Sequence, residues 1–304
     1  MTRTGSGGES EAESLARFAH RRETRSSLVK DAVERLVRDK LALAGMVIIG
    51  VLLLMALLAP LLTPYDPIGQ EILKRRQAPS AEHWFGLDDL GRDILSRVIF
   101  GARFSLQVGV VSVSLAILVG AVIGAGSGYL GGWVDTLVMR LMDIMLAFPA
   151  LLLAIAIVTI LGPGLMNMLY AIAIVSIPAY ARIVRASVLM VKEQDYILAA
   201  RSVGVPPTRL LFRNVLPNCL TPLIVQATLG IGTAILDAAG LSFLGLGAQP
   251  PKPEWGAMLG QGRYSMFTAP HIVIFPGIAI MFTVLGFNLL GDGMRDALDP
   301  RLRI

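Results

Sequence analysis

The sequence predicts an all-α membrane protein with six transmembrane helices. Of its 304 residues, 54% are hydrophobic and only 16% are charged, whereas soluble domains carry about 25% charged residues. The apolar residues are also concentrated in long runs without a charged side chain, and a spanning helix needs about 20 such residues. These uncharged runs cover 41–65, 104–134, 144–181, 214–236 and 264–291.

Each uncharged run accounts for one predicted span, except the third, which accounts for two. Residues 144–181 contain the turn signal Gly162-Pro163-Gly164, which divides them. Pro149 is expected to kink the helix that precedes this turn. The predicted spans are 42–63, 104–127, 141–161, 165–181, 219–243 and 271–290.

The second span is rich in glycine, with Gly109, Gly120 and Gly124 among its residues. Small residues let membrane helices approach one another closely. We interpret these glycines as helix-packing positions, and a flexible gate is the alternative.

The distribution of basic residues predicts the topology. If both termini are cytoplasmic, 19 of the 27 Lys and Arg residues lie in cytoplasmic segments and 8 in outer segments. This agrees with the positive-inside rule and places residues 182–218 in the cytoplasm. The net charge of +5 is therefore interpreted as a consequence of topology, and no nucleic-acid partner is expected.

The region before the first span has two parts. Residues 1–26 are rich in Gly, Ser, Glu and Arg and predict a disordered tail. Residues 28–38 place apolar side chains at helical spacing, which is typical of a helix at the membrane interface or of one packed on a partner. We divide the chain into 1–40 (tail and interfacial helix), 41–103 (first span and extracytoplasmic loop) and 104–304 (core of five helices).

Two outer segments are expected to be irregular. Residues 64–103 predict a turn-rich loop and a short amphipathic helix that leads into the second span. Residues 241–259 contain prolines and glycines that disfavour a regular helix. In the first segment, ion pairs are expected to fix the loop, and the candidates are Asp88, Arg92, Asp93 and Arg97.

Residues 192–218, the coupling segment, form a charged, proline-containing stretch between apolar runs. Residues 195–203 can form a short helix that ends at Gly204. Pro206 suits the first turn of a second helix, which is expected to stop before Pro217. Two short helices with Ala199 and Ala200 on the surface would let another backbone come close.

The pattern of small residues in this segment resembles the cytoplasmic coupling loop of ABC importer permeases. That loop reads Glu-Ala-Ala, three residues, Gly, nine residues, Ile, one residue, Leu-Pro, and five of these seven positions match. Leu198 replaces the Glu and Asn214 replaces the Ile. The resemblance implies that ATPase coupling involves Tyr196, Ala199, Ala200, Arg201, Gly204, Pro206, Arg209, Leu216 and Pro217.

Further stretches resemble the dipeptide/oligopeptide/nickel branch of this family, and the resemblance covers roughly residues 40–303. It is carried by residues 83–106, 241–259 and 288–300. It implies the type I ABC importer permease fold in the bacterial inner membrane. It also implies a sister permease, two ATPase subunits or domains, and an extracytoplasmic substrate-binding protein as partners.

No cofactor is expected on this chain. The sequence lacks the phosphate-binding pattern G-x-x-x-x-G-K-[ST], so ATP and magnesium are expected on the partner ATPases. The single cysteine, Cys219, excludes a thiolate metal cluster, and the scattered histidines argue against any other metal site.

Charged and polar residues within or near the spans are further candidates. Arg140 and Asp143 are expected to pair at the start of the third span, and Asp135 is expected to cap that helix. Asp237 is an isolated charge in the fifth span, and such residues are functional candidates. The expected translocation-path residues are Asp237, Ser242 and Phe243.

Alternative functions are a secondary transporter and an intramembrane protease, in which Ser242 and His271 would be the reactive pair. Neither needs a segment that docks on an ATPase. Di- and oligopeptides are the expected cargo, and nickel or another small solute is the alternative.

Overall fold

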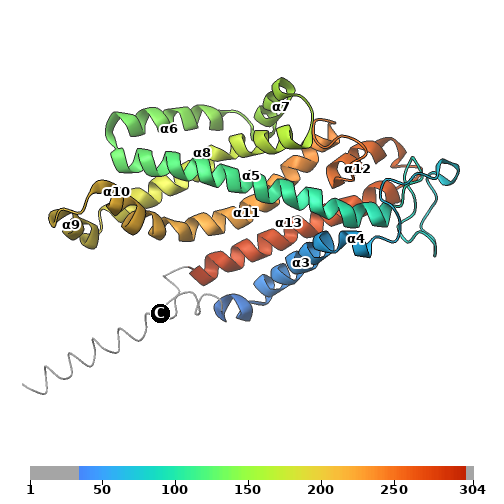
Figure 1. The fold of residues 1–304 in the computed structure, drawn as a ribbon, viewed down its shortest axis with the longest axis horizontal. Helices are drawn as coiled ribbons and strands as arrows, with labels where there is room; N and C mark the ends of the chain where they lie inside the picture. Colours follow the sequence, from blue (N-terminus) through green and yellow to red (C-terminus); the bar gives the residue numbers. More distant parts are fainter. Residues whose placement is uncertain (1–33, 299–304) are drawn as a thin grey trace, which may run out of the picture.

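The computed structural model describes residues 34–298, and its long helices lie side by side along the longest axis of the molecule (Figure 1). They are α3 (Lys40–Leu57), α5 (Ile94–Leu130), α8 (Leu165–Lys192), α11 (Leu216–Phe243) and α13 (His271–Leu298). α5 packs mainly against α8 and α11, and α13 packs mainly against α11 and α3. The shorter helices are α4 (Ala59–Leu62), α6 (Gly132–Ala147), α7 (Ala150–Leu161), α9 (Asp195–Ser202), α10 (Pro207–Leu210) and α12 (Trp255–Gly262), with single-turn segments η2 (Ile72–Lys74), η3 (Leu211–Val215) and η4 (Arg263–Ser265).

The predicted all-α membrane class is confirmed. Five described helices are long and apolar enough to cross a membrane, and a sixth span results if α6 and α7 count as one. Helices suit this role because they satisfy their backbone hydrogen bonds internally.

The third predicted span, 141–161, is wrong in its start, whereas the predicted kink at Pro149 is confirmed. α6 begins at Gly132, and α6 and α7 meet at an angle of 94°. The break falls at Phe148, whose extended backbone (ψ 139°) precedes Pro149, since a residue before proline is driven out of the helical region. Figure 1 shows α6 running along α8, whereas α7 lies across the bundle.

Three helices, α5, α8 and α13, extend well beyond the spans predicted from hydrophobicity, and α13 continues from the predicted end at residue 290 to Leu298. α8 continues from the predicted end at residue 181 to Lys192. The helix expected to lead into the second span is present as the first part of α5, which begins after Asp93 and continues into the span without a break. The Asp93 carboxylate accepts a hydrogen bond from Ser96 N–H at 2.8 Å and so caps the helix.

The interface between α5 and α8 supports the packing interpretation of the glycines. A Cβ atom on Gly124 would lie 2.2 Å from the Ala181 carbonyl oxygen, and one on Gly120 would lie 3.0 Å from the Ile177 oxygen. Only glycine permits these distances, so the two backbones approach as small-residue membrane interfaces do.

The loop end of the bundle, formed by residues 63–93 and α12, is tied together by polar groups. Arg92 Nε donates to Asp88 Oδ2 at 2.7 Å, which confirms the expected role of this ion pair in fixing the loop. α11 ends at Phe243, which confirms the predicted end of the fifth span. Of the segment 241–259 that was expected to be irregular, residues 244–254 lie outside any helix, whereas α12 begins at Trp255. α12 is regular because Glu254 caps it and the three prolines lie before its first residue.

The predicted disordered tail, residues 1–26, lies outside the described residues, as do residues 28–33 of the predicted interfacial helix. Residues 34–38 of that helix are helical.

Candidate functional site

The first helix of the coupling segment, α9, stands at the end of the bundle opposite α12 (Figure 1). It is fixed by Ile197, which is fully buried, whereas Tyr196 and Leu198 on either side are 47% and 43% exposed. Ala199 is also exposed, and Ala200 is half-buried. α9 therefore inserts one side chain into the core and presents its small and aromatic residues outward.

Gly204 ends α9 as predicted. Its φ of +80° is the left-handed conformation that favours glycine. Gly204 N–H donates to the Arg201 carbonyl at 3.0 Å, and Val205 N–H donates to the Ala200 carbonyl at 3.1 Å. This pair of hydrogen bonds is the Schellman motif, which satisfies the last carbonyls of a helix.

The second helix of the coupling segment differs from the prediction. Pro206 precedes α10 as its N-cap residue, and Pro207 occupies the first turn instead. The helix also does not stop before Pro217. It passes through the π-helical segment η3 and continues as α11, with Leu216 N–H donating to the Leu211 carbonyl.

Pro217 gives a physical reason for this π segment. Proline has no N–H to donate and its ring crowds the carbonyl four residues earlier, so a regular α-helical register is disfavoured here. The wider π-helical turn avoids the clash between the proline ring and that carbonyl. π segments often occur at functional sites. The second helix of the coupling segment thus continues into a candidate span without a break.

Sequence reasoning missed the residues that hold the segment in place. Ile197 and Leu210 are both buried, and Asn218 Nδ2 donates to Tyr196 Oη at 3.0 Å, which links α9 to α11. Each of the two apolar residues is the one buried residue of its short helix, so no repeat of apolar residues marks it in the sequence. The hydrogen bond between Asn218 and Tyr196 joins two separate helices, so no local sequence pattern predicts it.

The exposed surface of the segment combines apolar and basic side chains. Val203 is 80% exposed and Phe212 is 68% exposed. The neighbouring Arg201, Arg209 and Arg213 are exposed as well. Exposed apolar side chains next to charges are typical of a protein interaction site.

The charges near the third span pair differently from the prediction. Asp135 lies within the first turn of α6, not at its cap, and accepts two hydrogen bonds from Arg185 at 2.5 Å. Asp143 pairs with Arg182 at 2.5 Å, not with Arg140. Both pairs join α6 to α8, because the packing of these two helices places Arg182 and Arg185 of α8 beside the two aspartates of α6.

The three expected path residues lie toward the loop end of α11. Asp237 is half-buried, and Phe243 is 39% exposed. Ser242 is buried, and its hydroxyl lies 3.4 Å from Met168 Sδ. At 3.6 residues per turn, Ser242 and Phe243 point about 140° and 120° around the helix from Asp237, so the three residues do not share one face of α11.

The structure does not support the protease alternative. His271 Nε2 lies 3.3 Å from the Leu87 carbonyl oxygen, whereas Ser242 contacts Met168. Among residues 34–298, no group of three His, Cys, Asp or Glu side chains is placed to hold a metal ion.

Comparison with known proteins identifies the family. Residues 116–304 match the family described as "Binding-protein-dependent transport system inner membrane component". This chain belongs to that family. Residues 27–79 also match the "N-terminal TM domain of oligopeptide transport permease C".

Individual relatives cover most of the chain. It is 53% identical to the dipeptide transport system permease protein DppC of Alkalihalophilus pseudofirmus, over 90% of both chains. It is 48% identical to the glutathione transport system permease protein GsiD of Pectobacterium atrosepticum, over 88% of this chain and 90% of that protein. GsiD of Escherichia coli is also 48% identical, with 88% and 89% covered.

A solved structure shares the fold. A chain in an inward-facing conformation of the MetNI methionine ABC transporter superposes with a TM-score of 0.57 at 19% identity, covering 67% of this chain and 97% of that one. Membership of the family makes this chain a multi-pass permease subunit of a binding-protein-dependent ABC importer in the inner membrane, and a non-catalytic component.

Proposed function

We propose that this chain forms half of the translocation path of an importer for di- or oligopeptides. A sister permease would form the other half, and an extracytoplasmic binding protein would deliver the peptide. The observation that carries this proposal is the 53% identity to a dipeptide transport permease over 90% of both chains.

The coupling segment is proposed to be the docking site for an ATPase subunit. Its exposed Val203 and Phe212 need a partner surface, and the continuous π-to-α connection into α11 can transmit a displacement from α9 to a span. ATP and magnesium would be bound by the ATPase, whose closure stabilises one of two permease conformations. This arrangement requires that the coupling segment and both termini are cytoplasmic.

Asp237 is proposed to line the path. It is half-buried in a candidate span and makes no hydrogen bond or ion pair within residues 34–298. A carboxylate facing lipid is costly, so a water-filled path is the better environment for it. Phe243, which is 39% exposed and lies one to two turns further along α11 on another face, is proposed to line the path as well, whereas Ser242 is buried.

The cargo is tested with the purified binding protein and the assembled importer in vesicles. Calorimetry against dipeptides, longer peptides, glutathione and nickel identifies the ligand, and ATP-driven uptake of the labelled ligand confirms it. We expect short peptides to bind and accumulate. Glutathione is the second candidate because of the relatives at 48% identity. Uptake of nickel alone would contradict the proposed cargo but leave the importer function intact.

A further inference from the structure

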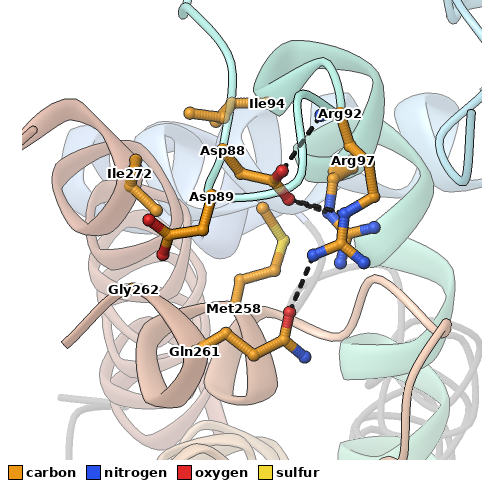
Figure 2. A pocket seen from close by; sticks show the side chains of 9 residues that line it. All are labelled: Asp88, Asp89, Arg92, Ile94, Arg97, Met258, Gln261, Gly262 and Ile272. Atoms are coloured by element: carbon orange, nitrogen blue, oxygen red, sulfur yellow. Dashed lines mark hydrogen bonds and ion pairs between the residues drawn. The ribbon is translucent and has the colours of Figure 1, made fainter. Parts of the chain in front are cut away.

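A small cavity lies at the loop end of the bundle, away from the coupling segment, and it has no part in the proposed import function. It lies between the loop that carries Asp88 and Arg92, the first turns of α5 with Arg97, and α12 with Gln261 (Figure 2). Its volume is about 20 Å³. A single water needs roughly 10–15 Å³ on a comparable measure, so the cavity has room for one small group.

Arg97 supplies unused donors to this cavity. Its side chain is 1% exposed, and its Nη1 donates to the Pro67 carbonyl at 2.9 Å. Its Nε and Nη2 have no hydrogen-bond partner within the described chain. Two buried guanidinium nitrogens without acceptors are costly, because they have lost their hydrogen bonds to water. For this reason buried polar groups in folded proteins are almost always paired.

The charges around the cavity are unequal. Asp88 is the carboxylate nearest to both guanidinium groups, at 2.7 Å from Arg92 Nε and 3.6 Å from Arg97 Nε. The carboxylate of Asp89 points to the opposite side (Figure 2) and pairs with Arg76 at 2.5 Å. Asp93 is paired with His83 and caps α5. The single carboxylate of Asp88 is therefore the nearest negative charge for both buried guanidinium groups, those of Arg92 and Arg97.

We propose that this cavity binds one small monovalent anion of chloride size, held by Nε–H and Nη2–H of Arg97. A negative charge balances the second guanidinium, which a neutral water does not. A carboxylate from a partner protein cannot reach Arg97 because the side chain is buried. The anion would brace the loop end, where Arg92 Nη2 already donates to Gln261 Oε1 at 2.9 Å.

The first test locates the ion. Crystals of the assembled importer are soaked in bromide, whose anomalous scattering marks its position. We expect a peak beside Arg97 Nε and Nη2. An ordered water in this position without anomalous signal at saturating bromide would overturn the proposal, whatever the transported cargo is.

The second test measures the energetic effect. The full-length chain in detergent is heated at constant ionic strength while chloride replaces gluconate. We expect a saturable rise in the unfolding midpoint of about 2–4 °C, which Arg97→Gln abolishes. Arg103→Gln is the matched control, because Arg103 is exposed on the same helix and lies over the Phe100 ring. An equal chloride response in Arg97→Gln would contradict the assignment; if that variant does not fold, the bromide peak decides.

Discussion

Gly204 combines a left-handed backbone with open space around its Cα. Its φ is +80°, and a Cβ atom would meet nothing within 4 Å. A side chain here therefore causes backbone strain, which costs about 1–2 kcal/mol for a residue that does not favour this conformation, and it projects toward any docked partner.

We predict that Gly204→Phe abolishes ATP-driven uptake while the protein still inserts into the membrane. Gly204→Asn is the matched control, because asparagine tolerates the left-handed conformation, and it should retain most uptake. Uptake by Gly204→Phe at the normal rate would contradict the role assigned to this turn.

Glu254 is the buried carboxyl group that caps α12. It is 2% exposed and accepts hydrogen bonds from Gly256 N–H at 3.0 Å and Ala257 N–H at 2.8 Å. Burial raises the pKa of this carboxyl above its usual value, and the hydrogen bonds that it accepts oppose the rise in pKa only in part. The folded state thus binds the proton more tightly than the unfolded state.

This sign predicts that the stabilising contribution of Glu254 is complete below the unfolded pKa of about 4.3 and is lost as the pH rises through the folded pKa. Thermal unfolding from pH 4 to pH 8 measures it. Glu254→Gln should remove this part of the pH dependence. An unchanged pH profile in the variant would show that another group is responsible.

At the scale of elements, the π segment η3 sets the orientation of the coupling segment relative to α11. The five residues of η3 lead directly into α11. Removing one residue between two helical segments rotates one about 100° relative to the other, because an α-helix has 3.6 residues per turn.

We predict that deletion of Phe212 abolishes uptake and the coupling of ATP hydrolysis to transport, with membrane insertion intact. Phe212→Ala keeps the chain length and is the control for loss of the exposed ring; it should retain coupling in part. Normal transport by the deletion variant would show that the orientation of α9 is not important.

The elements also show what sequence reasoning can predict. The presence of six candidate spans and the end of α9 at Gly204 were predicted, because long apolar runs and a glycine after a helix can both be recognised within a short stretch of sequence. A kink at Pro149 was predicted, but its size of 94°, the π segment before Pro217 and the Asp135–Arg185 pair were not. The ion pairs depend on a neighbouring element, since the α8 arginines lie 50 and 39 residues from Asp135 and Asp143. The bend angle and the π turn depend on how the chain accommodates Pro149 and Pro217.

At the scale of the molecule, the two ends of the bundle differ in character. One end carries the coupling segment with its basic and apolar surface, and the other carries the loop 63–93 and α12 (Figure 1). The family assignment rests on matches over most of the chain, whereas the orientation in the membrane rests on the distribution of Lys and Arg. The two ends can therefore be tested separately.

We predict opposite accessibility for cysteines placed at these ends. Leu73 is fully exposed and Val203 is 80% exposed, and the natural Cys219 is buried. In intact cells, a membrane-impermeant thiol reagent should label Leu73→Cys and should label Val203→Cys only after permeabilisation. The reverse pattern would contradict the proposed topology.

Cysteine crosslinking in the assembled importer tests directly whether the coupling segment docks on an ATPase subunit. Val203→Cys in the coupling segment should crosslink to an ATPase subunit, with a yield that changes when ATP is bound, and Leu73→Cys should not. Crosslinks to the ATPase from Leu73→Cys but never from Val203→Cys would show that the coupling segment is not the docking site for the ATPase.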